Sequence, residues 1–113
     1  MKFISPGVNG RWMHIGTDDT YIALSPARIE LDGKKFKPYS GMPGVNHLAY
    51  VVEDADAVRD RLLAAGYKES TVPNEHKFRK RVYFYDPEGN DWEFVQYYTD
   101  DPAKRNDYDL PDK

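Results

Sequence analysis

The stretch Tyr83-Phe84-Tyr85-Asp86-Pro87-Glu88-Gly89-Asn90-Asp91-Trp92-Glu93 decides the fold of this chain. Pro87 fixes φ near the value that a turn needs, and Gly89 and Asn90 tolerate positive φ, so a turn is predicted at residues 86–90. The aromatic run before this turn and the run at residues 91–98 after it are typical of β-strands. The two runs are therefore predicted to pair as a β-hairpin.

Glu93 is the unusual residue of this hairpin. Side chains of a strand alternate between its two faces, so Glu93 shares a face with Asp91, Val95 and Tyr97. The opposite face carries Trp92, Phe94, Gln96 and Tyr98. A carboxylate among large apolar neighbours is costly unless it is paired, hydrogen-bonded or bound to a metal ion. Glu93 is therefore a candidate functional residue.

Composition excludes several classes of protein. With 113 residues and a net charge of −3, the chain has the size of one small domain, and 14% aromatic residues argue against intrinsic disorder. The absence of cysteine excludes a disulfide framework and favours a reducing cytoplasm. No signal peptide and no apolar run of membrane-spanning length is present, and the acidic balance argues against nucleic-acid binding. We expect a cytoplasmic protein with neither a membrane nor a nucleic acid as its partner.

The first part of the chain is predicted to contain strands at residues 1–4, 11–15 and 20–24. The segment 25–44 is rich in Pro, Gly and Lys, and is predicted to be a linker with at most a short strand at residues 28–31.

The second part is predicted to begin with a strand at residues 45–52. A helix follows from about residue 55 to residue 65, because Asp54 is a suitable N-cap and Gly66 a suitable residue after the C-cap. Its apolar stripe consists of Val58, Leu62 and Leu63. A strand at residues 67–72 and a polar loop at residues 73–78 precede the hairpin.

The two parts repeat each other. Residues 11–15 align with residues 81–85, and residues 21–24 align with residues 92–95. We predict an α+β fold with a partial βββ module and linker at residues 1–43, a complete βαβββ module at residues 44–99, and a polar, poorly ordered tail at residues 100–113. The first module is shorter than the second by one strand and one helix.

Three segments carry a resemblance to a known family: Val45-Asn46-His47-Leu48-Ala49-Tyr50, Leu62-Leu63-Ala64-Ala65-Gly66, and the stretch from Tyr83 to Glu93. Together they resemble the vicinal oxygen chelate superfamily, which includes glyoxalase I, extradiol dioxygenases, fosfomycin-resistance enzymes and bleomycin-resistance proteins. The match covers roughly the whole second module. The resemblance implies paired βαβββ modules whose sheets curl around a cleft.

The resemblance also implies a metal site. In the metal enzymes of this superfamily, a His on the first strand of a module and a Glu on its last strand are ligands, and His47 and Glu93 occupy these positions. His47 is a single imidazole that alternates with the apolar residues Val45, Ala49 and Val51. An imidazole and a carboxylate suit Zn, Ni, Mn or Fe(II). The alternative is a buried His–Glu hydrogen bond without a metal.

The chain departs from the family pattern at the third ligand, which is commonly a His on the first strand of the other module. No such strand is predicted here, Ile22 stands where Glu93 repeats, and the chain is expected to begin inside a longer ancestral frame. His14 lies on a different strand and is expected to be structural or on the surface. His76 lies in a polar loop beside cations and is expected to be solvated.

The candidates for substrate binding are Tyr21, Trp92, Tyr83, Tyr97 and Arg81. Tyr21 and Trp92 occupy matching repeat positions, and either line the cleft or pack in the core. Tyr83 and Tyr97 are candidate hydrogen-bond donors to a bound oxyanion. Arg81 belongs to a basic cluster with Lys77, Arg79 and Lys80, which either attracts an anionic substrate or is a solvated face. No residue is assigned a catalytic role.

Three functions remain open. The first is a metal-dependent enzyme, a lyase, dioxygenase or resistance transferase, acting on a small oxygen-chelating substrate. The second is a metal-free protein that sequesters a small aromatic or cationic compound, and the third is a module that acts only in assembly. A homodimer is predicted, because the short first module leaves a sheet edge and an apolar face uncovered.

Overall fold

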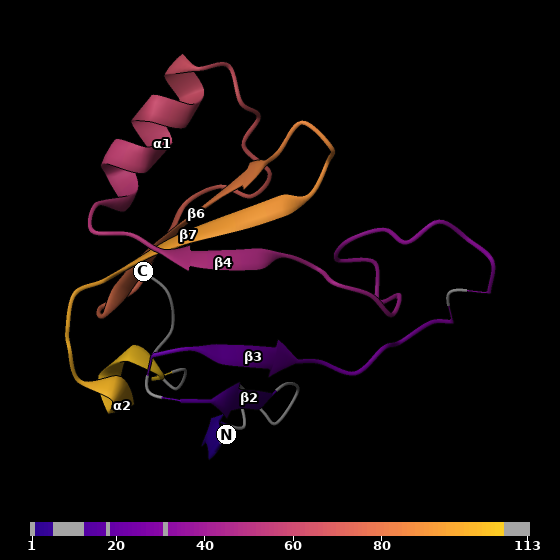
Figure 1. Cartoon of the computed structure of the whole chain (residues 1–113), viewed down its shortest axis with the longest axis horizontal. Coiled ribbons are helices and arrows are strands. Elements are labelled where there is room, and N and C mark those ends of the chain that lie inside the picture. Colours follow the sequence, from indigo (N-terminus) through magenta and orange to yellow (C-terminus); the bar gives the residue numbers. More distant parts are fainter. Residues whose placement is uncertain (1, 6–12, 18, 31, 108–113) are drawn as a thin grey trace.

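The computed structural model describes residues 2–5, 13–17, 19–30 and 32–107, shown in colour in Figure 1. Parts of the predicted strands at residues 1–4, 11–15 and 28–31, and residues 108–113 of the predicted tail, lie outside this range. The elements are, in chain order, β1 (Lys2–Ser5), β2 (Met13–Gly16), β3 (Tyr21–Leu24), β4 (Leu48–Val51), α1 (Ala55–Ala64), β5 (Asn74–Glu75), β6 (Arg79–Tyr85), β7 (Asp91–Tyr97) and α2 (Pro102–Arg105). The strands form two sheets, ordered β1-β2-β3 and β4-β7-β6-β5. The predicted α+β class is confirmed.

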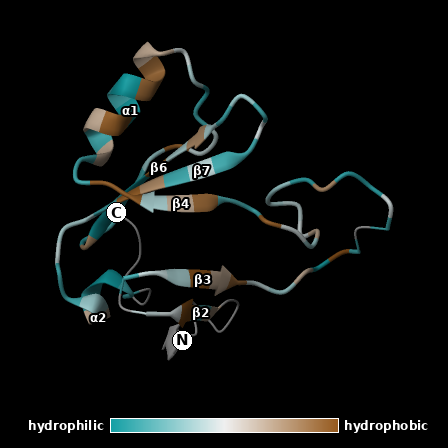
Figure 2. Cartoon of the chain, in the orientation of Figure 1, coloured by the Kyte–Doolittle hydropathy of each residue, from teal (hydrophilic) through white to brown (hydrophobic). Residues whose placement is uncertain are grey.

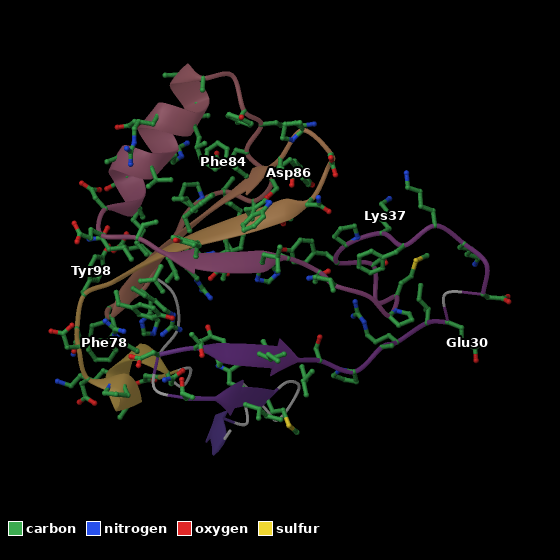
Figure 3. All side chains as sticks on the ribbon, viewed as in Figure 1. Glu30, Lys37, Phe78, Phe84, Asp86 and Tyr98 are labelled. Carbon is green, nitrogen blue, oxygen red and sulfur yellow. The ribbon has the colours of Figure 1, made fainter. Side chains whose placement is uncertain are left out.

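The second sheet is built around the predicted hairpin of β6 and β7. These strands are antiparallel, with Tyr83 opposite Glu93, and β4 lies parallel to β7 on its other side. Helix α1 covers one face of this sheet, and the first sheet lies on the opposite side (Figure 1). The core under the helix contains Ala55, Val82 and Phe84, with Val52, Leu62 and Phe94 packed against it. Phe84 lies between helix and sheet in Figure 3.

The hairpin turn forms at residues 86–90 as predicted. Gly89 has φ +86°, and its N–H donates to the carbonyl oxygen of Asp86. The Asp86 carboxylate accepts from the backbone N–H groups of Glu88 and Asn90, and from the indole Nε1 of Trp92 at 3.0 Å. Hydrogen bonds from Trp92 and Asn90 lower the pKa of Asp86 to about 2.

Helix α1 begins at the predicted residue and ends at Ala64, one residue before the predicted end, with Ala65 as its C-cap. Asp54 accepts a hydrogen bond from the N–H of Ala57, and Gly66 adopts φ +87° after the C-cap. The predicted apolar stripe is wrong in one position, because Leu63 is 42% exposed while Leu62 packs on the core. The helix contacts β6 and β7, so only the side facing those strands is buried.

The predicted strand at residues 67–72 and the loop that follows it differ from the structure. Residues 68–70 hydrogen-bond to β6 through the carbonyl of Lys68 and the N–H of Ser70, without forming a regular strand. The strand β5 forms instead at Asn74–Glu75, inside the predicted loop. Pro73 separates the two pieces, since proline cannot donate a ladder hydrogen bond.

Two other boundaries also differ. The strand predicted at residues 45–52 is shorter, so His47 lies just before β4 and not within it. The tail predicted to be poorly ordered contains α2, whose N-cap Asp101 accepts from the N–H of Ala103. The sequence 28–30 forms no strand.

The first sheet has one uncovered face in the part of the chain that is described. The pairing of Met13 with Leu24 and of Ile15 with Ile22 places these four side chains on the same face. Ile22 and Leu24 are 56% and 50% exposed. Figure 2 shows hydrophobic residues on β2 and β3, with α1 far from them on the second sheet.

Candidate functional site

The structure brings His47 and Glu93 together. Nε2 of His47 lies 3.3 Å from Oε1 of Glu93, and the Glu93 side chain is almost completely buried. Glu93 comes from the middle of β7. Ala49 of the parallel strand β4 pairs with Glu93, so His47, two positions before Ala49, lies beside the start of β7. Glu93 points away from α1, because its neighbour Phe94 packs against the core under the helix.

The contact between His47 and Glu93 shifts the pKa of each side chain in the direction that favours its charged form. The hydrogen bond to Glu93 raises the pKa of His47 above its usual range, although burial acts in the opposite direction. Burial by itself raises the pKa of Glu93, but hydrogen bonds from His47 and Tyr83 together outweigh it and lower that pKa. Each of these shifts favours the charged form of its group, and the two side chains face each other on the sheet surface opposite the helix.

Two residues beside this pair were not predicted as site residues. The hydroxyl of Tyr39 lies 3.3 Å from Nδ1 of His47 and donates to Oδ2 of Asp91 at 2.9 Å. Asp91 is buried and also accepts from the hydroxyl of Ser70. Asp91 was detectable in the sequence, because it shares a strand face with Glu93. Tyr39 belongs to the predicted linker, where no periodic pattern marks it.

Tyr83 and Arg81 border the pair on β6, as the alternation of that strand requires. Tyr83 is buried opposite Glu93, and its ring meets the imidazole of His47 edge to face at 5.9 Å between centroids. Burial, followed by the charge of Glu93, raises the pKa of the Tyr83 hydroxyl. Arg81 donates from Nε to Oδ1 of Asn74 at 2.6 Å.

A cavity of about 470 Å³ opens on the same sheet face. Neither His47 nor Glu93 lines it, but Ala49, which pairs with Glu93, does. Val95 and Tyr97 line it from β7, where the two-residue period places them on the same face as Glu93. Ala49 and Val51 line it from β4 and follow His47 at the same two-residue spacing. The remaining walls come from the β2–β3 turn and β3, from Tyr50, and from the C-terminal segment: Asp19, Thr20, Tyr21, Tyr50, Arg105 and Asn106. Its volume falls within the range typical of small-molecule sites.

Of the two matching aromatic candidates, the structure brings only Tyr21 to this cavity. Trp92 lies on the helix-covered face, where it donates to Asp86 and borders a smaller hollow of about 200 Å³ with Leu62 and Phe84. Of the two roles considered for Trp92, packing on the core side is therefore the one observed, and its candidacy as a substrate-binding residue of the cleft is wrong. The physical reason is the two-residue period of β7, which sends Trp92 and Glu93 to opposite faces.

The two remaining histidines are both buried. His14 is 3% exposed and stacks on Tyr21 with 4.1 Å between ring centroids, as expected for a structural residue, and burial lowers its pKa. The prediction of a solvated His76 is wrong, because this residue is 0% exposed. Its ring Nδ1 accepts a hydrogen bond from the backbone N–H of Phe78. Its backbone N–H donates to the carbonyl of Arg79, so the loop folds over the ring.

The donor set fits a divalent metal in kind but is incomplete in number. A neutral imidazole and a carboxylate are suitable ligands, whereas catalytic sites usually take three protein ligands. Within the described residues, no group of three or more His, Asp or Glu side chains is placed to hold a metal ion. Asp91 is the nearest additional carboxylate in the sequence, and its oxygens are engaged by Tyr39 and Ser70.

The fold and the paired side chains define a small α+β protein of two sheets, with a His–Glu pair on the face of the second sheet opposite its helix. Residues 1–94 match the family model described as the Glyoxalase/Bleomycin resistance protein/Dioxygenase superfamily. The chain belongs to this superfamily, as the sequence resemblance predicted. No curated protein matches the chain. In the described part of the structure, no helix has the length and apolarity to cross a membrane.

Several solved structures are similar to this chain. The protein SMU.1112c has 21% identity and a TM-score of 0.45, with 74% of this chain and 68% of that chain covered. A glyoxalase/bleomycin resistance protein/dioxygenase domain from Frankia sp. has 21% identity and a TM-score of 0.44, with 85% and 77% covered. A lactoylglutathione lyase from Agrobacterium tumefaciens has 15% identity and a TM-score of 0.41, with 84% and 74% covered.

Proposed function

We propose that this protein is a metal-dependent enzyme that acts on a small oxygen-chelating substrate, with His47 and Glu93 as metal ligands. The observation that supports this proposal is a nearly buried carboxylate 3.3 Å from an imidazole, beside a cavity of ligand size. Within the described residues, no group of three or more His, Asp or Glu side chains could hold the metal by itself. The proposal therefore requires further ligands from a second chain, from water or from the substrate.

The surrounding residues have defined roles in this proposal. A bound divalent metal supplies Lewis-acid chemistry to the substrate oxygens. Tyr39 fixes the His47 ring through its hydroxyl, since it lies within hydrogen-bonding distance of Nδ1 and is itself held by Asp91. Tyr83 places a hydroxyl beside Glu93, and the buried β7 strand excludes water from that side of the carboxylate.

Elemental analysis of protein purified without chelator tests this function. We expect a divalent metal in near-stoichiometric amount in the unchanged protein. In His47→Ala and in Glu93→Gln, the metal content should fall by about tenfold or more. Glu88→Gln is the matched control, because Glu88 lies exposed in the hairpin turn, and its metal content should equal that of the unchanged protein. The proposal is contradicted if the unchanged protein contains only trace metal, or if both ligand variants contain as much metal as the unchanged protein.

A metal-free binding protein is the second candidate. It is favoured by the direct contact of His47 with Glu93, which gives each side chain a partner without a metal, and by the tyrosine rings of Tyr21, Tyr50 and Tyr97 around the cavity. In this case a small aromatic compound stabilises chelator-treated protein against thermal unfolding, by an amount that rises with ligand concentration. Stabilisation that needs added metal excludes this candidate.

A further inference from the structure

The cavity beside the His–Glu pair carries a cation at its far end from that pair. Tyr97 lies four residues beyond Glu93 on β7, which corresponds to roughly 13 Å along the strand. The guanidinium carbon of Arg105 lies 4.8 Å from the centre of the Tyr97 ring, and both side chains line the cavity. The walls between these two ends are contributed by apolar residues, Val95, Val51 and Ala49.

Arg105 is held in this position by the body of the protein. Arg79, a buried residue of β6, donates from Nη1 to the carbonyl oxygens of Asp107 at 2.7 Å and of Arg105 at 3.4 Å. Arg105 itself donates from Nε to the carbonyl of Thr99 at 2.7 Å. These contacts fix the segment after β7 against the sheet, so the guanidinium is positioned before any ligand arrives.

The charge of Arg105 is only weakly compensated. Its Nη2 lies 3.5 Å from the carboxylate of Asp100, whose side chain is fully exposed to solvent. Asp19, which also borders the cavity, is exposed as well. Exposed ion pairs contribute little, and within the described residues Nη1 of Arg105 has no hydrogen-bond partner. A guanidinium with free donors on an apolar wall suits a carboxylate, which it binds with two parallel hydrogen bonds.

We propose that Arg105 selects ligands that carry a carboxylate on an apolar or aromatic body, with the carboxylate bound at the Arg105 end of the cavity. This inference deepens the proposed function, on which it rests for the role of the cavity as the substrate site, by naming the substrate class. It also decides against a cationic ligand in this cavity. A ligand of about 10 Å in length fits between the carboxylate position and the His–Glu pair, given the strand spacing.

Calorimetric titration of chelator-treated full-length protein tests the selection, with 4-phenylbutyrate and its neutral amide as probes. We expect the carboxylate to bind about tenfold or more tightly than the amide, because a charge-assisted bidentate contact is lost in the amide. In Arg105→Gln this ratio should fall to near one, and Arg105→Lys should retain part of it. Equal affinity for both probes, no binding of either, or an unchanged ratio in Arg105→Gln overturns the proposal.

Arg61→Gln is the matched control, because Arg61 is exposed on α1, on the helix-covered side of the sheet. It should leave the ratio unchanged. The thermal unfolding midpoint of each variant shows whether it is folded, and Arg105→Lys keeps the test informative if Arg105→Gln unfolds. The titration uses metal-free protein, so its outcome is independent of the metal analysis. If the protein prefers the carboxylate but is purified without metal, this inference stands and the metal-enzyme proposal fails. If the protein is purified with metal but shows no carboxylate preference, the metal-enzyme proposal stands and this inference fails.

Discussion

At the scale of single residues, the His47–Glu93 contact joins a buried carboxylate to its imidazole partner. Glu93 is 6% exposed, so removing its partner leaves a buried carboxylate with fewer hydrogen bonds. We expect each single alanine substitution to lower the free energy of unfolding by about 1–3 kcal/mol. The double variant should show a coupling energy of about 0.5–3 kcal/mol in urea titrations of chelator-treated protein. A coupling energy of zero contradicts the direct contact.

Asp86 gives a prediction for pH dependence. Its pKa in the folded protein is about 2, below the usual value of 3.8, because Trp92 and Asn90 donate to the ionised carboxylate. The stabilisation from these hydrogen bonds is therefore complete above the unfolded pKa and is lost as the pH falls through about 2. The NMR chemical shift of the Trp92 indole N–H should titrate with a midpoint near 2. A midpoint near 4 is the contrary result, and Asp86→Asn should abolish the titration.

At the scale of elements, α1 is held by one side of its surface. Leu62 packs against the core of Ala55, Val82 and Phe84, whereas Leu63 is 42% exposed. Leu62→Ala should cost about 2 kcal/mol of unfolding free energy, the lower end of the range for core leucines, because Leu62 is only partly buried. Leu63→Ala should cost less than about 0.5 kcal/mol. If denaturant titration gives equal losses of unfolding free energy for the two variants, the observed orientation of α1 on the sheet is contradicted.

The end of α1 gives a second prediction at this scale. The N–H of Tyr67 donates to the carbonyl of Leu62, and that of Gly66 to the carbonyl of Leu63, while Gly66 has φ +87°. A side chain at this position meets no atom within 4 Å, so only the backbone conformation resists substitution. Gly66→Ala should lower the unfolding free energy by about 1 kcal/mol. Gly33, also at positive φ with open space around it, offers a comparison outside the helix.

At the scale of the whole molecule, we propose that the protein is a homodimer. Every residue of β4 is exposed although the strand is apolar, and Ile22 and Leu24 on β3 are exposed as well. Apolar strands with exposed faces favour pairing with another chain, and two-fold symmetry is the commonest result. Sedimentation equilibrium should give twice the mass of 13.1 kDa at micromolar concentration. A single-chain mass there refutes the proposal, and Tyr50→Lys should shift the protein towards monomer if β4 contributes.

The sequence by itself determined the local features of the second module. The turn at residues 86–90, the N-cap Asp54 and the positive φ of Gly66 each depend on neighbours in the chain, and all three are present. The two-residue period of β7 likewise placed Glu93 and Phe94 on opposite faces of the strand, as the packing of Phe94 on the core under the helix confirms. These predictions succeeded because turn, cap and strand preferences act over a few residues.

Only the tertiary structure decided which distant residues meet. Tyr39, in a segment without periodic pattern, is brought to Asp91, 52 positions away in the chain, by a hydrogen bond of 2.9 Å. His76 is buried and Arg105 reaches the cavity because Phe78, Arg79 and the segment after β7 fold onto each other. A polar loop and a charged tail are locally typical of solvated chain. Their burial depends on partners supplied by other elements, which no local pattern encodes.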